Sequence, residues 1–234
     1  MRHTRAPFIA ILAATLAALA TLHSAVAATV ARIETGRPGT ATFLLSGPIV
    51  AGDHDRMQSA LDKLPTGTAV SVMLESPGGL VTEGLKLGTL FHTARVATIV
   101  KGGGAICYSA CALAFLGGRD PRTGKPMRVK MSEGKLGFHQ FRRTFDPLKV
   151  YTRADYDAEV ARAQEITGFI VAYMRNIGED LSKLQLMLRA PTESMNVISN
   201  AECLQRGFHV LDEASGRLIE PGAPNAAQRL SALN

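Results

Sequence analysis

The middle of the chain alternates apolar runs with helical patterns, and this alternation constrains the fold more than any other feature. Ala69–Leu74 is an apolar, β-branched run typical of a strand buried on both faces. Apolar spacing predicts a helix over Val81–Phe91, a strand over Val96–Val100 and a further helix that begins at or beside Ser109. Strands and helices in this order favour parallel pairing through right-handed crossovers, so we expect an α/β fold.

The flanking segments extend the pattern over most of the chain. We expect a strand over Thr40–Leu45 and a helix over Asp53–Leu64 before it. After it we expect a polar hairpin-like excursion over Arg119–Glu133 and a strand end over Leu136–Gln140. Two helices follow, a long one over Tyr151–Asn176 opened by Thr152 and a second over Glu179–Arg189. The pattern ends with a short strand over Met195–Ile198, a capped short helix over Ser199–Gly207 and a last strand over Phe208–Leu211. No repeat and no second domain is evident.

The first residues have the three parts of a secretory leader. Arg2 and Arg5 form a basic start, and Pro7–Leu22 is an apolar run of sixteen residues, short for a membrane span. Ala25–Ala27 supplies a small-x-small cleavage pattern. We therefore predict a signal peptide over residues 1–27, a mature start near Ala28 and a periplasmic or secreted protein without stable membrane insertion. An uncleaved signal anchor is the alternative.

Composition supports one globular domain, which we place at residues 28–213, with a loose tail over 214–234. The chain is 46% hydrophobic and 20% charged, which favours a packed core over disorder. Loss of the two leader arginines lowers the formal net charge from +6 to +4. Basic residues are densest over Arg119–Lys135, where we expect a solvated loop. This mild charge gives no case for nucleic acid as a partner.

Three cysteines, Cys107, Cys111 and Cys203, bear on the redox state. Export permits disulfides. The spacing of Cys107 and Cys111 suits neither zinc nor redox motifs, because no cluster of His or Cys partners accompanies it. We expect these two to be small buried residues that pack the helix. A bond from one of them to Cys203 is an alternative that would leave an odd thiol. No metal site and no cofactor are predicted.

Ser109 is the candidate nucleophile. It follows a glycine-rich approach, Lys101–Gly104, and precedes an apolar helical run. At a helix start the backbone N–H groups lack partners and the helix dipole favours negative charge. Those are the conditions that an acyl-transfer oxyanion requires. The alternative is an ordinary N-cap serine on a buried helix.

Two further groups would complete such a site. Functional groups gather at the carboxyl ends of parallel strands, and Gly78 and Gly79 follow the strand next to that of Ser109. Without a Cβ, these glycines let a substrate carbonyl approach their N–H groups, which with the Ala110 N–H would form an oxyanion hole. A serine also needs a base, usually histidine. His139, which follows a strand-like run downstream, is the candidate.

Five segments, in this order, resemble the proteolytic subunit of the Clp protease (ClpP), and more closely the secreted ClpP-like proteins of the ClpP/crotonase superfamily. They are Phe43–Ile49, Glu75–Gly79, Cys107–Ala112, Gly137–Gln140 and Ser199–Gly207. The resemblance implies a ClpP/crotonase-like spiral of β-β-α units with a long helical handle-like insertion. It also implies Ser109 as nucleophile, His139 as base, and a homo-oligomer that acts on peptides or unfolded protein.

The resemblance is incomplete at the third member of the triad. The family has its acid four residues before the serine of the last segment, which here is Met195. Glu193, taken as the tentative third member, or Asn196 would replace it if the loop shifts; otherwise Ser109 and His139 act as a dyad. Export also separates the chain from cytosolic ATPase partners, so activity would be independent of ATP.

Three functions therefore compete. The first is a secreted serine hydrolase, a ClpP-like peptidase. The second is a non-catalytic ClpP-fold protein for binding or assembly, with a degraded triad. The third is a crotonase-type acyl-CoA enzyme, which ranks last because an exported enzyme would rarely meet CoA.

Overall fold

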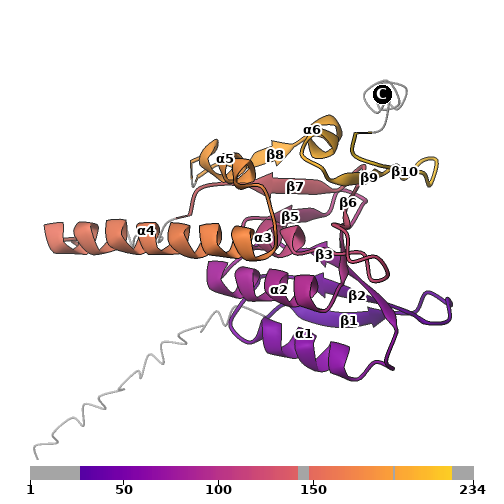
Figure 1. Cartoon of the computed structure of the whole chain (residues 1–234). Coiled ribbons are helices and arrows are strands. Elements are labelled where there is room, and N and C mark those ends of the chain that lie inside the picture. The colour runs from indigo at the N-terminus through magenta and orange to yellow at the C-terminus, as the bar shows by residue number, and fades with distance from the viewer. Residues whose placement is uncertain (1–26, 142–147, 192, 223–234) are drawn as a thin grey trace, which may run out of the picture.

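A seven-stranded sheet forms the centre of the computed structural model, which describes residues 27–141, 148–191 and 193–222 (Figure 1). The strand order is β1-β2-β3-β4-β6-β9-β10, and the five inner strands run parallel. The two edge strands pair antiparallel with their neighbours. The strands are Thr29–Ile33, Thr40–Ser46, Ala69–Glu75, Ala97–Val100, Arg128–Met131, His209–Leu211 and Leu218–Ile219. The expected mixed α/β architecture with a mostly parallel sheet is thus confirmed.

A second, three-stranded sheet lies beside the first. It consists of β5 (Ile106–Tyr108), β7 (Lys135–Phe138) and β8 (Asn196–Ile198), with β5 and β7 parallel and β8 antiparallel to β7. An isolated bridge between Ser76, just after β3, and Cys107 in β5 connects it to the main sheet. This connection brings the turn after β3 next to the end of β5.

Helices cover one face of the main sheet. The helices α1 (Asp53–Asp62), α2 (Val81–Thr93) and α3 (Ala110–Leu116) lie side by side against it (Figure 1). Residues of β2 and β3 alternate between buried and half-buried, as period-two side-chain alternation requires. The prediction that β3 is buried on both faces is therefore wrong, because no helix covers its second face within the described residues. There, Thr42 and Ser71 hydroxyls lie 2.9 Å apart in a hydrogen bond.

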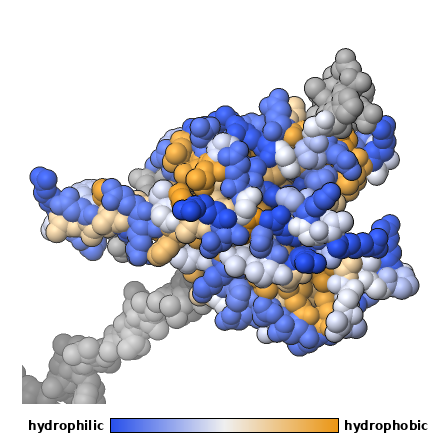
Figure 2. Space-filling model, in the orientation of Figure 1, coloured by the Kyte–Doolittle hydropathy of each residue, from blue (hydrophilic) through white to orange (hydrophobic). Residues whose placement is uncertain are grey.

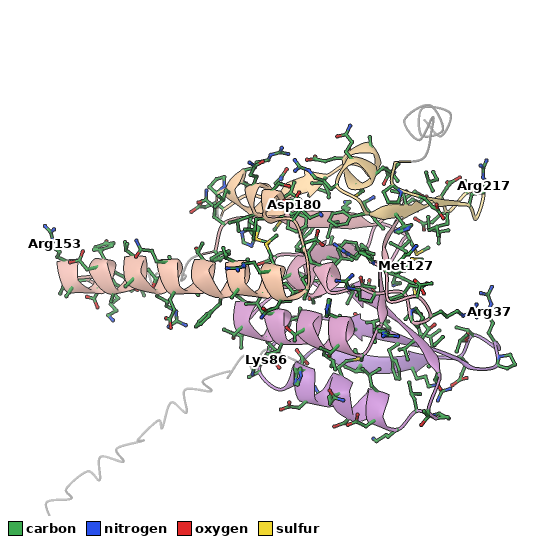
Figure 3. All side chains as sticks on the ribbon, in the orientation of Figure 1. Arg37, Lys86, Met127, Arg153, Asp180 and Arg217 are labelled. Atoms are coloured by element: carbon green, nitrogen blue, oxygen red, sulfur yellow. A yellow bond between two sulfur atoms is a disulfide. The ribbon has the colours of Figure 1, made fainter. Side chains whose placement is uncertain are left out.

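The long helix α4 (Arg153–Asn176) projects from the body. It begins with a capping box, in which Thr152 Oγ1 accepts from the Asp155 N–H at 3.2 Å and Asp155 Oδ2 accepts from the Thr152 N–H at 2.7 Å. Figure 3 shows Arg153, at the start of the helix, far from the body of the domain, whereas Asp180, just after the helix, lies at that body. The buried residues of α4 all lie in its last two turns: Ile170, Tyr173 and Met174. Burial of that end alone leaves the rest of the helix as a projecting handle.

The C-terminal third continues from α4 through η1 (Leu181–Lys183), α5 (Leu184–Leu188) and α6 (Asn200–Gln205). No helix in the described ranges is long and apolar enough to cross a membrane. Two predicted segments lie mostly outside the described residues. They are the signal peptide, of which only residue 27 is described, and the tail, of which residues 223–234 lie outside.

Several elements differ from the sequence-based expectation. β1 was not foreseen, and β10 lies in the segment expected to be a loose tail. The hairpin expected over Arg119–Glu133 covers only its first part, where Arg119 bridges Pro126, because the rest forms β6. β6 lies between β4 and β9 inside the main sheet, so this stretch is not a solvated loop.

The sequence pattern does not predict β6 as a strand because two of its four residues are cationic yet buried. Arg128 is 4% exposed and forms a salt bridge with Glu179, while its guanidinium lies 5.8 Å from the Phe208 ring centre. Lys130 is 3% exposed and donates to three oxygens, one of them Asn200 Oδ1 at 2.5 Å. Burial lowers the pKa of Arg128 to about 10. Partners and an aromatic face thus compensate in part for the loss of water, since Arg128 Nε is buried without a hydrogen bond.

Candidate functional site

Ser109 occupies a sharp turn between β5 and α3. Its backbone has φ 56° and ψ −120°, a region that costs a non-glycine residue about 1–3 kcal/mol. Among the described residues, only Ser109 and Arg95 combine a side chain with positive φ. The strand-turn-helix arrangement is that of a nucleophile elbow, which exposes the serine hydroxyl at the top of a sheet.

Backbone pairing explains why the chain accepts this turn. The Ser109 N–H donates to the Gly137 carbonyl at 3.1 Å, and the Ser109 carbonyl accepts from the Leu113 N–H at 3.2 Å. Ser109 therefore begins α3, yet its side chain makes no capping hydrogen bond to that helix. An N-cap serine would use its hydroxyl for such a bond. The position is that of a cap, but the hydroxyl is not used as one.

The Gly78–Gly79 turn lies against the Ser109 elbow. A Cβ on Gly78, whose φ is 96°, would lie 2.7 Å from Ser109 Cβ and 2.6 Å from the Tyr108 carbonyl oxygen. A Cβ on Gly79 would collide with the carbonyl of Ile49. Both positions therefore require glycine for close approach, and the turn lies in contact with the candidate nucleophile.

The N–H groups of this turn have different partners. The Gly78 N–H donates to the buried Ser76 hydroxyl at 3.0 Å, so it is already used. The Ile49 N–H donates to the Gly78 carbonyl at 2.8 Å, and the Ile49 carbonyl accepts from the Leu80 N–H at 2.9 Å. Because Ile49 thus pairs with the residues on both sides of Gly79, the Gly79 N–H points away from Ile49. Gly79 and Ala110, at the first position of α3, are the available donors. The role of Ser76 was missed by sequence reasoning, although it lies within the glycine motif.

Close packing of α2 against α3 fixes the position of the Ser109 turn relative to Gly78. A Cβ on Gly84 would collide with the Ala110 carbonyl, and one on Gly88 would collide with the Tyr173 hydroxyl. That hydroxyl donates to the Leu113 carbonyl at 2.8 Å. Burial raises the pKa of Tyr173, so it remains a neutral donor. The glycines of α2 thus let α3 lie near enough to present Ser109 beside Gly78.

His139 reaches the site because β7 runs parallel to β5. Tyr108 pairs with Gly137, so Ser109 and His139 lie just beyond the same pair at the carboxyl ends of both strands. The half-buried His139 and Ser109 line one small pocket with apolar side chains, those of Val81, Leu113, Phe138, Phe141 and Met187. The pocket volume of about 10 Å³ is close to that needed by one water molecule.

The proposed third members lie in and before β8. Extension of the β7–β8 register places Met195 opposite His139, and its Cγ would lie 2.6 Å from a Cβ on Gly137. Glu193 is exposed. Asn196 pairs with Phe138, and its side-chain N–H donates to the Leu186 carbonyl at 3.0 Å. The Met195 thioether thus packs over Gly137, two residues before His139 in the chain.

A disulfide joins Cys107 and Cys111, with their Cα atoms 5.2 Å apart, while Cys203 is free and buried. Both bonded cysteines are fully buried, as expected, but they are linked to each other, and the alternative bond to Cys203 is wrong. A separation of four residues across a strand-to-helix turn is compatible with a bond because the turn folds the chain back. Burial raises the pKa of Cys203 to about 12, so this thiol is unreactive.

Two larger cavities lie away from Ser109. One of about 410 Å³ surrounds Arg37 and the first residues of β2, β3 and β4, which is the amino end of the parallel strands. Another of about 380 Å³ lies between α2 and α4. Neither lining combines a serine or cysteine with a histidine, so chemistry favours the smaller Ser109 pocket. The described residues include no group of three or more His, Cys, Asp or Glu side chains that could hold a metal ion.

Compared with models of known protein families and with curated protein sequences, the chain matches neither a family nor a characterised protein.

Proposed function

We propose that the chain is a secreted serine hydrolase, an ATP-independent peptidase with a ClpP/crotonase-like fold. Ser109 is its nucleophile and His139 its general base, and the N–H groups of Gly79 and Ala110 form the oxyanion hole. The observation that carries the proposal is the backbone of Ser109. A non-glycine residue is held in a strained conformation at a strand-to-helix turn, and such strain clusters at functional sites.

The proposed reaction has two steps. Ser109 Oγ attacks the substrate carbonyl carbon while His139 takes the hydroxyl proton. The carbonyl oxygen becomes an oxyanion that the two N–H groups stabilise, and one such donor is typically worth a factor of about 10²–10³ in kcat. The intermediate collapses, and the leaving amine or alcohol departs with the proton from His139. A water molecule, deprotonated by His139, then hydrolyses the acyl-enzyme.

The residue at the family's acid position, Met195, shapes the expected activity. A triad acid holds the imidazole tautomer and stabilises the imidazolium, and its loss alone costs about 10⁴ in kcat. Met195 cannot fill this role, so we propose slow turnover by a Ser109–His139 dyad unless another residue supplies the acid. Glu193 stays an open candidate for the third member.

The location and assembly of the protein follow from other features. The tripartite leader favours export, and a disulfide is compatible with an oxidising compartment. Apolar patches alternate with polar ones along projecting α4 (Figure 2), where the exposed apolar residues are Tyr156, Val160 and Phe169. Exposed apolar area on a projecting helix favours burial against a second copy, so we propose a homo-oligomer.

A second candidate is a non-catalytic protein for binding or assembly. The packing of Met195 over Gly137 favours it, because a thioether there cannot orient a histidine. A fluorophosphonate probe separates the two, since it reacts only with an activated serine. We expect a covalent adduct on the mature wild-type chain and none on Ser109→Ala; an unlabelled, folded wild type would favour the binding protein.

A further inference from the structure

The disulfide encloses the candidate nucleophile. Cys107 lies in the centre of β5 and Cys111 in the first turn of α3, so the ring they close contains Tyr108, Ser109 and Ala110. Ser109 carries the hydroxyl and Ala110 one of the two oxyanion donors. Every group that the elbow contributes to the site therefore lies between the two half-cystines.

Both ends of the disulfide are fixed to the rest of the site. The backbone of Cys107 pairs with Ser76 on one side and with Leu136 on the other. These are the segments that carry the glycine turn and His139. Cys111 belongs to α3, which packs closely on α2 at Gly84. The S–S bond thus joins the helix to the strand that lies between the oxyanion turn and the base.

Global stabilisation is a weak explanation for this bond. The entropic effect of a cross-link on the unfolded chain grows with the length of the closed loop, and here the sequence separation is four. A bond meant to stabilise the whole domain would connect distant segments. A short bond around one strained residue restrains that residue instead, and strain persists only where the surroundings hold it.

We propose that Cys107 and Cys111 are positioning residues, whose disulfide holds the Ser109 elbow in the conformation that aims its hydroxyl and the Ala110 N–H at the substrate. The proposal rests on the hydrolase function proposed above. Without the bond, the backbone hydrogen bonds of Ser109 to Gly137 and Leu113 must hold the turn alone, and Ser109 relaxes more readily toward an ordinary φ. A displacement of about 1 Å in a reacting group lowers the rate by about 10²-fold.

The test compares three forms of the mature chain with the wild type. The first is Cys107→Ala/Cys111→Ala. The second is wild type treated with dithiothreitol: the reagent is oxidised to its cyclic disulfide, and its two electrons and two protons convert the S–S bond into two thiols. Loss of the bond is checked by mass. The third is Cys203→Ala, a matched control that removes a buried thiol outside the site.

Two readouts are measured on each form. Turnover of a small ester, per serine titrated with fluorophosphonate, should fall 10- to 100-fold in kcat with KM changed less than about threefold, and reoxidation of the reduced wild type should restore it. Amide exchange over residues 105–113, which include the bonded Ser109 and Leu113 N–H groups, should become at least about tenfold faster, while residues 69–75 in β3 exchange as before. Cys203→Ala should match the wild type in both readouts.

Different failures have different meanings. Unchanged kcat and unchanged exchange at the elbow in the double variant and in the reduced wild type would overturn the positioning role. Faster exchange of β3 and the elbow alike would also overturn it, since that is the result of a purely structural bond. If wild type has no Ser109-dependent turnover, the hydrolase proposal falls, and the exchange readout still decides whether the disulfide holds the elbow.

Discussion

Replacement of Ser109 by glycine should stabilise the fold relative to replacement by alanine. Both variants lose the hydroxyl, so the comparison isolates the backbone. At φ 56° and ψ −120° a residue with a Cβ is strained by about 1–3 kcal/mol, and glycine removes this strain. Glycine costs about 0.5–1 kcal/mol more than alanine in lost freedom on folding.

The difference leaves Ser109→Gly more stable than Ser109→Ala by about 0–2.5 kcal/mol in the free energy of unfolding. For a chain of this size each 1 kcal/mol shifts Tm by about 2–4 °C. Urea unfolding and thermal melts, followed by circular dichroism, would measure both quantities. Ala112→Gly is the matched control, because it lies within α3, where glycine should cost about 1 kcal/mol. A Ser109→Gly variant that loses as much stability relative to Ser109→Ala as the control loses would refute the strain at the elbow.

Three further predictions concern the acid, the pH and the assembly. Met195→Asp should raise ester hydrolysis at least about tenfold, since a carboxylate opposite His139 would orient the imidazole. If Glu193→Ala instead lowers hydrolysis by two orders of magnitude and Met195→Asp gives no gain, Glu193 is the acid. The pKa of His92 is lowered from 6.5, first by burial and then by the positive charge of Arg119. Arg119 Nε donates to His92 Nδ1 at 3.0 Å. The unfolded chain then binds more protons, so stability should fall as pH drops below about 6.5 toward the folded pKa; Tm measured from pH 7.5 to 5.5 should fall less steeply in His92→Gln than in the wild type. Sedimentation of the mature chain at tens of micromolar should show an oligomer, and a monomer there would contradict a contact through α4.

The parallel α/β core could be predicted because local patterns and global packing agree there. β3 and β4 are apolar and β-branched, and helical spacing between them leaves few alternatives to a crossover. The same reasoning identified the glycine turn and Ser109 as neighbours, since both follow parallel strands. Their chemistry stays a proposal until the serine is tested.

Other features depend on contacts that sequence patterns do not record. β6 resembles a surface loop because Arg128 and Lys130 alternate within it, and only their tertiary partners explain their burial. β5 has three residues and adjoins a glycine-rich turn, so no periodicity marks it. The Cys107–Cys111 bond spans the turn from β5 to α3, and the sequence pattern marks neither that short strand nor the turn. Oxyanion donors are backbone groups, so their availability depends on partners such as Ser76.

The most direct test of the account is ester turnover by wild type and Ser109→Ala, each normalised to folded protein and followed by active-site titration. We expect slow turnover with a titratable serine in the wild type, and a fall to the uncatalysed rate with no titratable site in the variant. Equal rates in the two proteins would end the hydrolase proposal, and the strained elbow would then belong to a fold that has lost its chemistry.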